Sequence, residues 1–258
     1  MASFSTHCFR DFKRFIGELT ATAAGIHSAV KYTAHRSTKM DSDDPWADIA
    51  ATYNVKVNGL NSEKVLASAS RLNIVNIYSG FDLFLSTFRK EFYHLREIEW
   101  KAEKSDTPFS ELQRNLDLKN FRDTERIIQP QIVVIDYYRL ARNAIVHPSQ
   151  DNKISVQKFF EKKEPSINRV RIHYEMRSAP NKFDELNFHD VKLASRILLD
   201  VLRIIDAALD PGDRRLREMV PFSSWARYDT IRQRNAAINF LKQNYGISQE
   251  RAEKILAH

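Results

Sequence analysis

The longest apolar pattern in the chain runs from about Ser62 to Trp100 and constrains the fold more than any other feature. Apolar residues recur there at every third or fourth position, the spacing that places side chains on one face of a helix. They fall on more than one side, as in a central helix that packs against several neighbours. The apolar residues are Val65, Leu66, Ala69, Leu72, Val75, Tyr78, Phe81, Leu85, Phe88, Phe92 and Leu95. The sequence therefore predicts a helical bundle built around this segment.

Three further segments show the same spacing and extend the predicted bundle. They run from Phe9 to about Lys31, from about Thr124 to Val146, and from Phe188 to Leu209 before a stop at Asp210-Pro211-Gly212. The low content of glycine (six) and proline (eight) favours long helices over many short strands. We predict an all-α, antiparallel helical bundle over residues 1–212. In it the Ser62–Trp100 and Thr124–Val146 helices should be adjacent and antiparallel.

Weaker patterns predict shorter elements and an extension. A short helix is expected around Phe109 to Leu116, and Pro130 should kink the Thr124–Val146 helix or mark a later start. Residues 213–258 are predicted to form a separate, basic, helical C-terminal extension. Its main helix runs from Tyr228 to Tyr245 and can be capped by Gly246.

Residues 150–190 interrupt the helical pattern and predict a basic insertion of loops and a short strand. Charged and apolar side chains alternate from Arg169 to Tyr174, which is the period of a strand. Cations mixed with Phe159 and Phe160 suit single-stranded nucleic acid, through phosphate contacts and base stacking. The candidate RNA-binding cations are Lys158, Lys162, Lys163, Arg169 and Arg171. A solvated, irregular insertion explains the same composition, and the sequence leaves both readings open.

The net charge indicates which class of partner the chain favours, and the cysteine content indicates the compartment. The formal net charge is +7 and the pI is near 9.4, which favours polyanions such as nucleic acid. Cys8 is the only cysteine, so the chain has no internal disulfide and no cysteine-rich zinc site, as suits a reducing cytoplasm. No stretch is long and uncharged enough to span a bilayer, and neither a Gly-rich phosphate loop nor HExxH occurs. We expect a cytoplasmic protein that needs no metal or other cofactor.

The Thr124–Val146 helix closes on Arg142-Asn143-Ala144-Ile145-Val146-His147, and Pro148 follows. Proline disfavours helical geometry in the residue before it, so His147 should lie at or just past the last turn. Around the helix axis Asn143 is about 40° from His147, whereas Arg142 is about 140° from it. Asn143 therefore lies on the same side of the helix as His147, one turn before it. Arg142 reaches it only if the last turn loosens or a second surface, such as another copy of the helix, closes over the end.

Arginine followed by asparagine and then, after three residues, by histidine resembles the signature of the HEPN superfamily, the higher eukaryotes and prokaryotes nucleotide-binding domains. The match at Arg142, Asn143 and His147 is complete. The resemblance implies an all-α domain that forms a homodimer with its two motifs facing each other. In catalytic members it implies metal-independent cleavage of RNA. The usual setting is toxin–antitoxin or antiviral defence, which implies tRNA or mRNA as target and an antitoxin or defence-system partner.

The chemistry of these residues is suited to RNA, because the 2′-hydroxyl beside each phosphate is a built-in nucleophile. An imidazole titrates near neutral pH, so His147 can take the hydroxyl proton or protonate the leaving 5′-oxygen. Arg142 can stabilise the charge of the transition state, and Asn143 can orient His147 or the phosphate. The products would be a 2′,3′-cyclic phosphate and a 5′-hydroxyl. A non-catalytic HEPN-type module that binds RNA or protein is the alternative, and an unrelated helical protein is a third reading.

Two further residues are candidates for this site. Asp82 lies seven residues after Val75 and three before Leu85, on the apolar stripe, where a carboxylate must be paired or belong to a site. Within the resemblance, Asp82 matches a polar or acidic position that faces the motif helix. A salt bridge that holds the bundle explains Asp82 equally well. Tyr138 precedes Arg142 by four residues and is a candidate for stacking on RNA, although core packing is the favoured reading.

Overall fold

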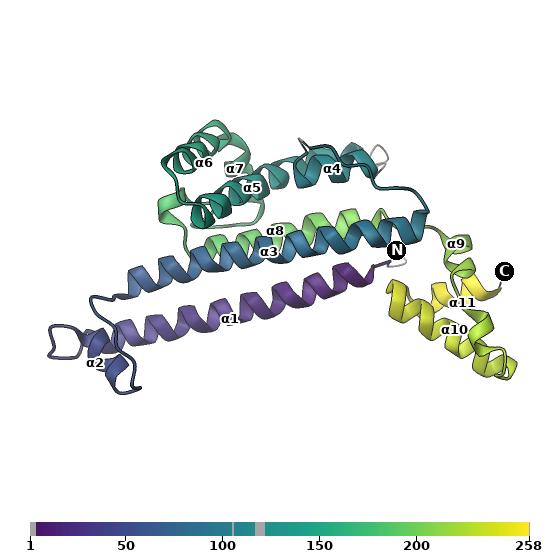
Figure 1. Cartoon of the computed structure of the whole chain (residues 1–258), viewed down its shortest axis with the longest axis horizontal. Helices are drawn as coiled ribbons and strands as arrows, with labels where there is room; N and C mark the ends of the chain where they lie inside the picture. Colours follow the sequence, from purple (N-terminus) through teal and green to yellow (C-terminus); the bar gives the residue numbers. More distant parts are fainter. Residues whose placement is uncertain (1–3, 105, 117–121, 258) are drawn as a thin grey trace. The chain divides into compact units, whose positions relative to one another are not determined.

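The computed structural model describes residues 4–104, 106–116 and 122–257, and their regular secondary structure is helical throughout (Figure 1). The longer helices are α1 (His7–Ser37), α3 (Ser62–Arg96), α5 (Arg122–Val146), α6 (Gln150–Lys162), α7 (Glu164–His173), α8 (Phe188–Ala207), α10 (Thr230–Tyr245) and α11 (Gln249–Ala257). The shorter ones are α2 (Pro45–Ala51), α4 (Pro108–Asn115), η2 (Phe183–Glu185), α9 (Asp213–Glu218) and η3 (Phe222–Trp225). The predicted all-α class is therefore confirmed.

The predicted long helices are present, with boundaries displaced at their ends. α1 continues past Lys31 to Ser37. α3 ends at Arg96 rather than at Trp100, because Glu97 takes a left-handed conformation with φ +54°. α5 runs through Pro130, so this proline does not mark a later start. α10 ends at Tyr245, and Gly246, which has φ +59°, forms the predicted cap.

The predicted strand between Arg169 and Tyr174 is wrong, because these residues belong to the end of α7 and the turn after it. A strand would place Val170, Ile172 and Tyr174 on one face. In the helix Val170 and Tyr174 are buried, whereas the Ile172 side chain is 76% exposed. The alternation was too short to exclude a helix, in which residues four apart share a face. The segment after the motif is thus mainly a pair of helices, α6 and α7.

The contacts divide the chain into two compact units, and we describe each by itself. Unit 1 consists of Met1–Arg14, Phe81–Arg126 and Leu199–His258, and unit 2 consists of Phe15–Gly80 and Ile127–Leu198. The predicted boundary at residue 212 falls inside unit 1, and the division into a bundle and an extension stays a prediction.

Unit 1 is held by aromatic packing and by buried polar contacts. Phe81 stacks on Phe109 of α4 with ring centroids 5.6 Å apart. Glu111 of α4 is buried and pairs with the Arg89 guanidinium at 2.8 Å, and it also accepts a hydrogen bond from the Trp100 indole. These contacts join the short helix α4 to α3 and provide the buried carboxylate with charged and neutral donors.

Unit 2 contains the parts of α3 and α5 that the sequence predicts to be neighbours. The Tyr78 hydroxyl of α3 donates to the Ile135 carbonyl of α5, and the two helices run in opposite directions (Figure 1). A Cβ atom placed on Gly80 would lie 2.2 Å from Cε1 of Phe15 on α1. The absence of a side chain at Gly80 therefore permits the close approach of α1 and α3.

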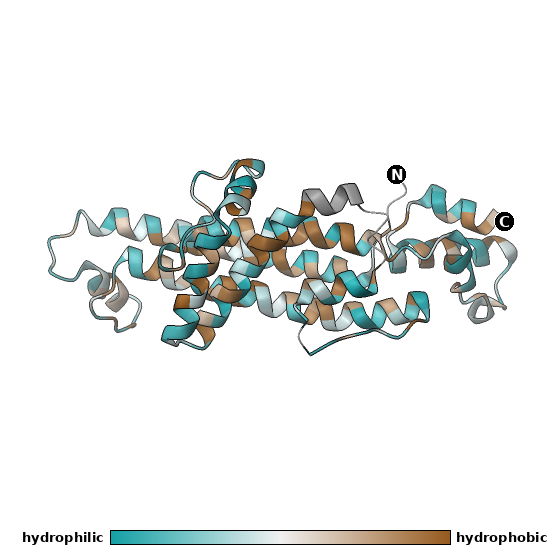
Figure 2. Ribbon diagram, turned by 90° about the horizontal axis from the view of Figure 1, so that it is seen from above, coloured by the Kyte–Doolittle hydropathy of each residue, from teal (hydrophilic) through white to brown (hydrophobic). Residues whose placement is uncertain are grey.

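The predicted burial of α3 on several sides is only partly correct. Leu72 and Leu83 are 62% and 69% exposed, whereas Ile74, Ile77 and Phe81 are wholly buried. The helix is thus amphipathic, and Figure 2 shows both hydrophobic and hydrophilic residues on the long helices. Among the described residues, no helix combines the length and the apolarity that a bilayer crossing requires.

Candidate functional site

The end of α5 has the geometry predicted from Pro148. α5 ends at Val146, and the His147 N–H donates to the Asn143 carbonyl at 2.8 Å, which completes the last turn. Ser149 then caps α6 by accepting a hydrogen bond from the Asn152 N–H at 3.1 Å. His147 therefore lies at the point where one helix has ended and the next has not begun.

Asn143 connects the three motif residues. Its side-chain oxygen accepts a hydrogen bond from Nη1 of Arg142 at 3.1 Å, and its carbonyl holds the His147 N–H. Arg142 and Asn143 are both half-buried. Asn143 thus fixes the guanidinium through its side chain and the position of His147 through its backbone.

His147 has a fixed backbone and an accessible side chain. Its carbonyl accepts a hydrogen bond from Nδ2 of Asn152 at 2.7 Å. The residue is exposed, and its imidazole forms no hydrogen bond or ion pair within the described part of the chain. An imidazole presented in this way can exchange a proton with a bound molecule without breaking an existing contact.

The buried carboxylate of Asp190 lies next to α5, one turn before Arg142. Asp190, in the first turn of α8, is 0% exposed, and it accepts a hydrogen bond from the Tyr138 hydroxyl at 2.8 Å. It also accepts from the N–H and the side-chain amide of Asn181, at 2.9 and 2.7 Å, and from the Asn187 N–H at 2.9 Å. Burial raises the pKa of Asp190, and these donors act in the opposite direction.

Tyr138 is therefore a core residue. It is 0% exposed, and the ring of Tyr137 lies 5.2 Å from its own. Its predicted stacking on RNA is wrong for this structure, because no face of the ring reaches solvent. Core packing, the other reading of the sequence, is correct.

Asp82 is exposed, contrary to its predicted place on a buried stripe. The buried side of α3 passes through its neighbour Phe81 and through Phe84 and Leu85. Adjacent helix positions are 100° apart, so residue 82 can leave the core while residue 81 enters it. The catalytic role of Asp82 stays a prediction, without the support that burial would have given it.

The predicted basic residues differ in accessibility. Lys158, Lys162 and Arg169 are exposed, and the first two lie four residues apart on α6 and so share a face. Lys163 is half-buried between α6 and α7. Arg171 is half-buried and donates to two backbone carbonyls, the nearer at 2.9 Å. Arg171 therefore supports the fold, and the other four retain cationic groups that a phosphate could reach.

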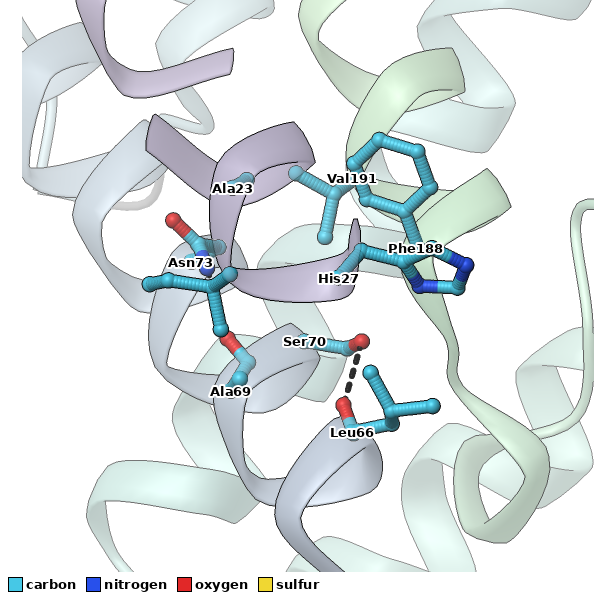
Figure 3. Close-up of a pocket in the computed structure, with 9 residues that line it drawn as sticks. Ala23, His27, Leu66, Ala69, Ser70, Asn73, Phe188 and Val191 are labelled. Carbon is cyan, nitrogen blue, oxygen red and sulfur yellow. Dashed lines mark hydrogen bonds between the residues drawn. The ribbon is translucent and has the colours of Figure 1, made fainter. Parts of the chain in front are cut away.

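A small cavity in unit 2 is lined by α1, α3 and α8 (Figure 3). Its volume is about 10 Å³, enough for about one water molecule. The His27 ring stacks on Phe188 with centroids 4.7 Å apart, and the Ser70 hydroxyl donates to the Leu66 carbonyl at 2.7 Å. Burial lowers the pKa of His27. A cavity of this size holds no substrate.

A larger, open hollow in unit 1 has a volume of about 530 Å³ and lies between the end of α3 and α9. Arg215 in its wall pairs with Glu97 at 2.5 Å and with Glu218 at 3.5 Å. The guanidinium is therefore neutralised by two carboxylates, and the hollow offers an anion no uncompensated charge. None of the predicted site residues lines it.

No protein-family model, no curated protein and no solved structure matches this chain. Within the described ranges, no group of three or more His, Cys, Asp and Glu residues is placed to hold a metal ion. The likeness to HEPN proteins consequently rests on Arg142, Asn143 and His147, together with the all-α class. The function has to be argued from the chemistry of these side chains.

Proposed function

We propose that the chain is a metal-independent endoribonuclease of HEPN type. The observation that carries the proposal is the arrangement at the end of α5. An exposed imidazole follows, after one turn, an arginine that an asparagine holds in place. A general acid–base group and a fixed cation are the two elements that cleavage of RNA by its own 2′-hydroxyl requires.

In the proposed reaction the 2′-oxygen attacks the adjacent phosphorus and gives up its proton to a His147 imidazole. The bond from phosphorus to the 5′-oxygen breaks, and a second imidazole protonates that leaving oxygen. Arg142 stabilises the negative charge on the pentacovalent phosphorus through N–H donors. The products are a 2′,3′-cyclic phosphate and a 5′-hydroxyl.

A homodimer would supply the second imidazole. The chain has one motif, so two copies of His147 require two chains, related by a two-fold axis with contact near their α5 ends. The biological setting that accompanies the proposal is toxin–antitoxin or antiviral defence, with tRNA or mRNA as target and an antitoxin or defence-system protein as regulator.

Digestion of bulk RNA in EDTA tests the proposal. The wild-type protein should release fragments with 2′,3′-cyclic phosphate ends. His147→Ala and Arg142→Ala should each lose on the order of 10²–10⁴ in rate. His35→Ala is the matched control, since His35 is another exposed histidine. An inactive wild type that still binds RNA would favour the non-catalytic HEPN-type module, and equal cleavage by His147→Ala would end the enzyme proposal.

A further inference from the structure

The exposed side of α10 has a composition unlike that of the other long helices. The sequence from Thr230 to Tyr245 contains three cations and five side-chain amides, and no aspartate or glutamate. The opposite side packs into unit 1 through Ala237, Ile238, Leu241 and Tyr245. The exposed residues are Thr230, Ile231, Arg232, Arg234, Asn235, Asn239, Lys242, Gln243 and Asn244. Six of them, Ile231, Arg232, Asn235, Asn239, Lys242 and Gln243, fall within about 120° of one another around the axis and form the exposed face, whereas Arg234 lies outside it.

The three cations of α10 are weakly compensated, both the two on this face, Arg232 and Lys242, and Arg234 outside it. Arg234 forms no hydrogen bond or ion pair with any residue that the structure describes. Arg232 has an exposed partner in the capping residue Asp229, at 3.4 Å, and Lys242 contacts only an amide oxygen, at 3.4 Å. By contrast, Arg251 in the same unit is bound by Asp210 at 2.6 Å and Asp213 at 2.8 Å. Positive potential is therefore available on α10.

We propose that the exposed face of α10 binds unpaired RNA. Arginine and lysine neutralise phosphates, and asparagine and glutamine form hydrogen bonds with the edges of bases. A face that carries both kinds of side chain without a carboxylate matches a strand whose phosphates and base edges are both accessible. A paired A-form helix hides its base edges in a deep, narrow groove, which makes an unpaired segment the better match.

Two apolar groups beside this face add to the match. Tyr228 is 53% exposed and directly precedes the Asp229 cap of α10, and Ile231 is 75% exposed in the first turn. An exposed aromatic ring next to cations is a platform on which a base can stack. The choice of RNA over DNA rests on the proposed function, whereas the choice of a nucleic acid rests on α10 itself.

Fluorescence anisotropy with a labelled, unstructured 20-nucleotide RNA tests the inference. His147→Ala protein in EDTA is used throughout, so that binding is measured without turnover. Changing Arg232 and Lys242, the two cations of the exposed face, together to Gln should weaken binding at least tenfold. It should also lower the slope of log affinity against log salt by about 1.4, since each phosphate contact on a single strand contributes about 0.7.

The matched control changes Lys13 and Lys90 to Gln, which removes the same charge from exposed positions outside α10. It should leave both affinity and salt slope nearly unchanged. Asn235→Ala with Asn239→Ala should weaken RNA binding without altering the salt slope, because no charge is removed. Equal weakening by the two charge-removing double variants would show general attraction by net charge and overturn the inference.

The two proposals fail in different ways. If RNA binding depends on α10 but the wild type does not cleave RNA, the nuclease proposal is overturned and this inference stands. Cleavage by the wild type with RNA binding insensitive to the α10 changes overturns the inference alone. Tighter, α10-dependent binding of duplex DNA than of unpaired RNA overturns the assignment of RNA as the ligand.

Discussion

The Tyr138 hydroxyl donates a hydrogen bond of 2.8 Å to the buried carboxylate of Asp190, one turn before Arg142. This contact joins α5 to the first turn of α8 inside unit 2. The same carboxylate holds the Asn181 and Asn187 backbones. Asp190 therefore holds the motif end of α5 in place through Tyr138, although Asp190 itself takes no part in the proposed chemistry.

Tyr138→Phe should lower the free energy of unfolding by roughly 1–3 kcal/mol, because a buried carboxylate loses one of its donors. Urea denaturation of the purified protein measures the change. Tyr32→Phe is the control, since Tyr32 is 66% exposed and should change stability by less than about 0.5 kcal/mol. Equal stability of the two variants would show that the Tyr138–Asp190 contact contributes little.

Asp206 should make unit 1 less stable as the pH rises. It is 1% exposed, accepts hydrogen bonds from the Thr6 N–H and hydroxyl, and burial raises its pKa to about 6. A raised pKa means that the folded state binds the proton more tightly than the unfolded state, so stability falls as the carboxyl ionises. Between about pH 4 and 6 the fall should amount to about 3 kcal/mol. Asp206→Asn should lack it, and parallel pH profiles for the two proteins would refute the assignment.

Cys8 should be inert in the folded protein. It is 5% exposed, and burial raises the pKa of its thiol to about 12. Only the thiolate reacts readily with thiol reagents. At pH 8 a chromogenic disulfide should therefore label no cysteine in native buffer and one per chain in concentrated urea. Rapid labelling without denaturant would show that the first turn of α1 opens easily.

Substitution by alanine should have opposite effects on stability at Gly80 and at Gly25. Nothing lies within 4 Å of a Cβ built on Gly25, so Gly25→Ala should raise thermal stability by up to about 1 kcal/mol. Gly80→Ala should lower it, because the new methyl displaces the ring of Phe15. In a Phe15→Ala background the change at residue 80 should become neutral or stabilising. If Gly80→Ala stabilises the wild-type protein, the close approach of α1 and α3 is adjustable.

The helical spacing of apolar residues was enough to predict α1, α3, α5 and α8, since burial on one side imposes that spacing in the sequence itself. It failed from Arg169 to Tyr174, where six residues fit both a strand and a helix. Only the burial of Val170 and Tyr174 together, four positions apart, decides for the helix. Short segments leave the period undetermined, and tertiary packing then selects the structure.

The candidate site was likewise predictable from the sequence only in part. Pro148 places His147 at a helix end by local sterics alone, so this geometry was predictable. The buried carboxylate was not predictable: Asp82 lies between Phe81 and Leu83 but is exposed, whereas Asp190 lies between His189 and Val191 and is wholly buried. Burial of Asp190 depends on donors from Tyr138 and from the segment before α8. These are distant in sequence, and only the folded chain brings them together.

His147 and Arg142 should differ in how much their side chains contribute to stability. Both residues lie near the end of α5, shortly before Pro148. In the structure the His147 side chain is exposed and unbonded among the described residues, whereas Arg142 is half-buried and donates to the Asn143 side chain. His147→Ala should therefore change the free energy of unfolding by less than about 0.5 kcal/mol. Arg142→Ala should cost about 1–2 kcal/mol, because it leaves a partly buried acceptor without its donor.

Urea unfolding of both variants, alongside the RNA digestion, measures this difference. Both should lose cleavage, but only Arg142→Ala should lose stability, so activity must be assayed where that variant is still fully folded. Asp82→Ala, at an exposed position, should change the free energy of unfolding by less than about 0.5 kcal/mol. If His147→Ala costs as much stability as Arg142→Ala, the imidazole is a packing element rather than an accessible acid–base group. The argument for catalysis at the end of α5 would then lose its main observation.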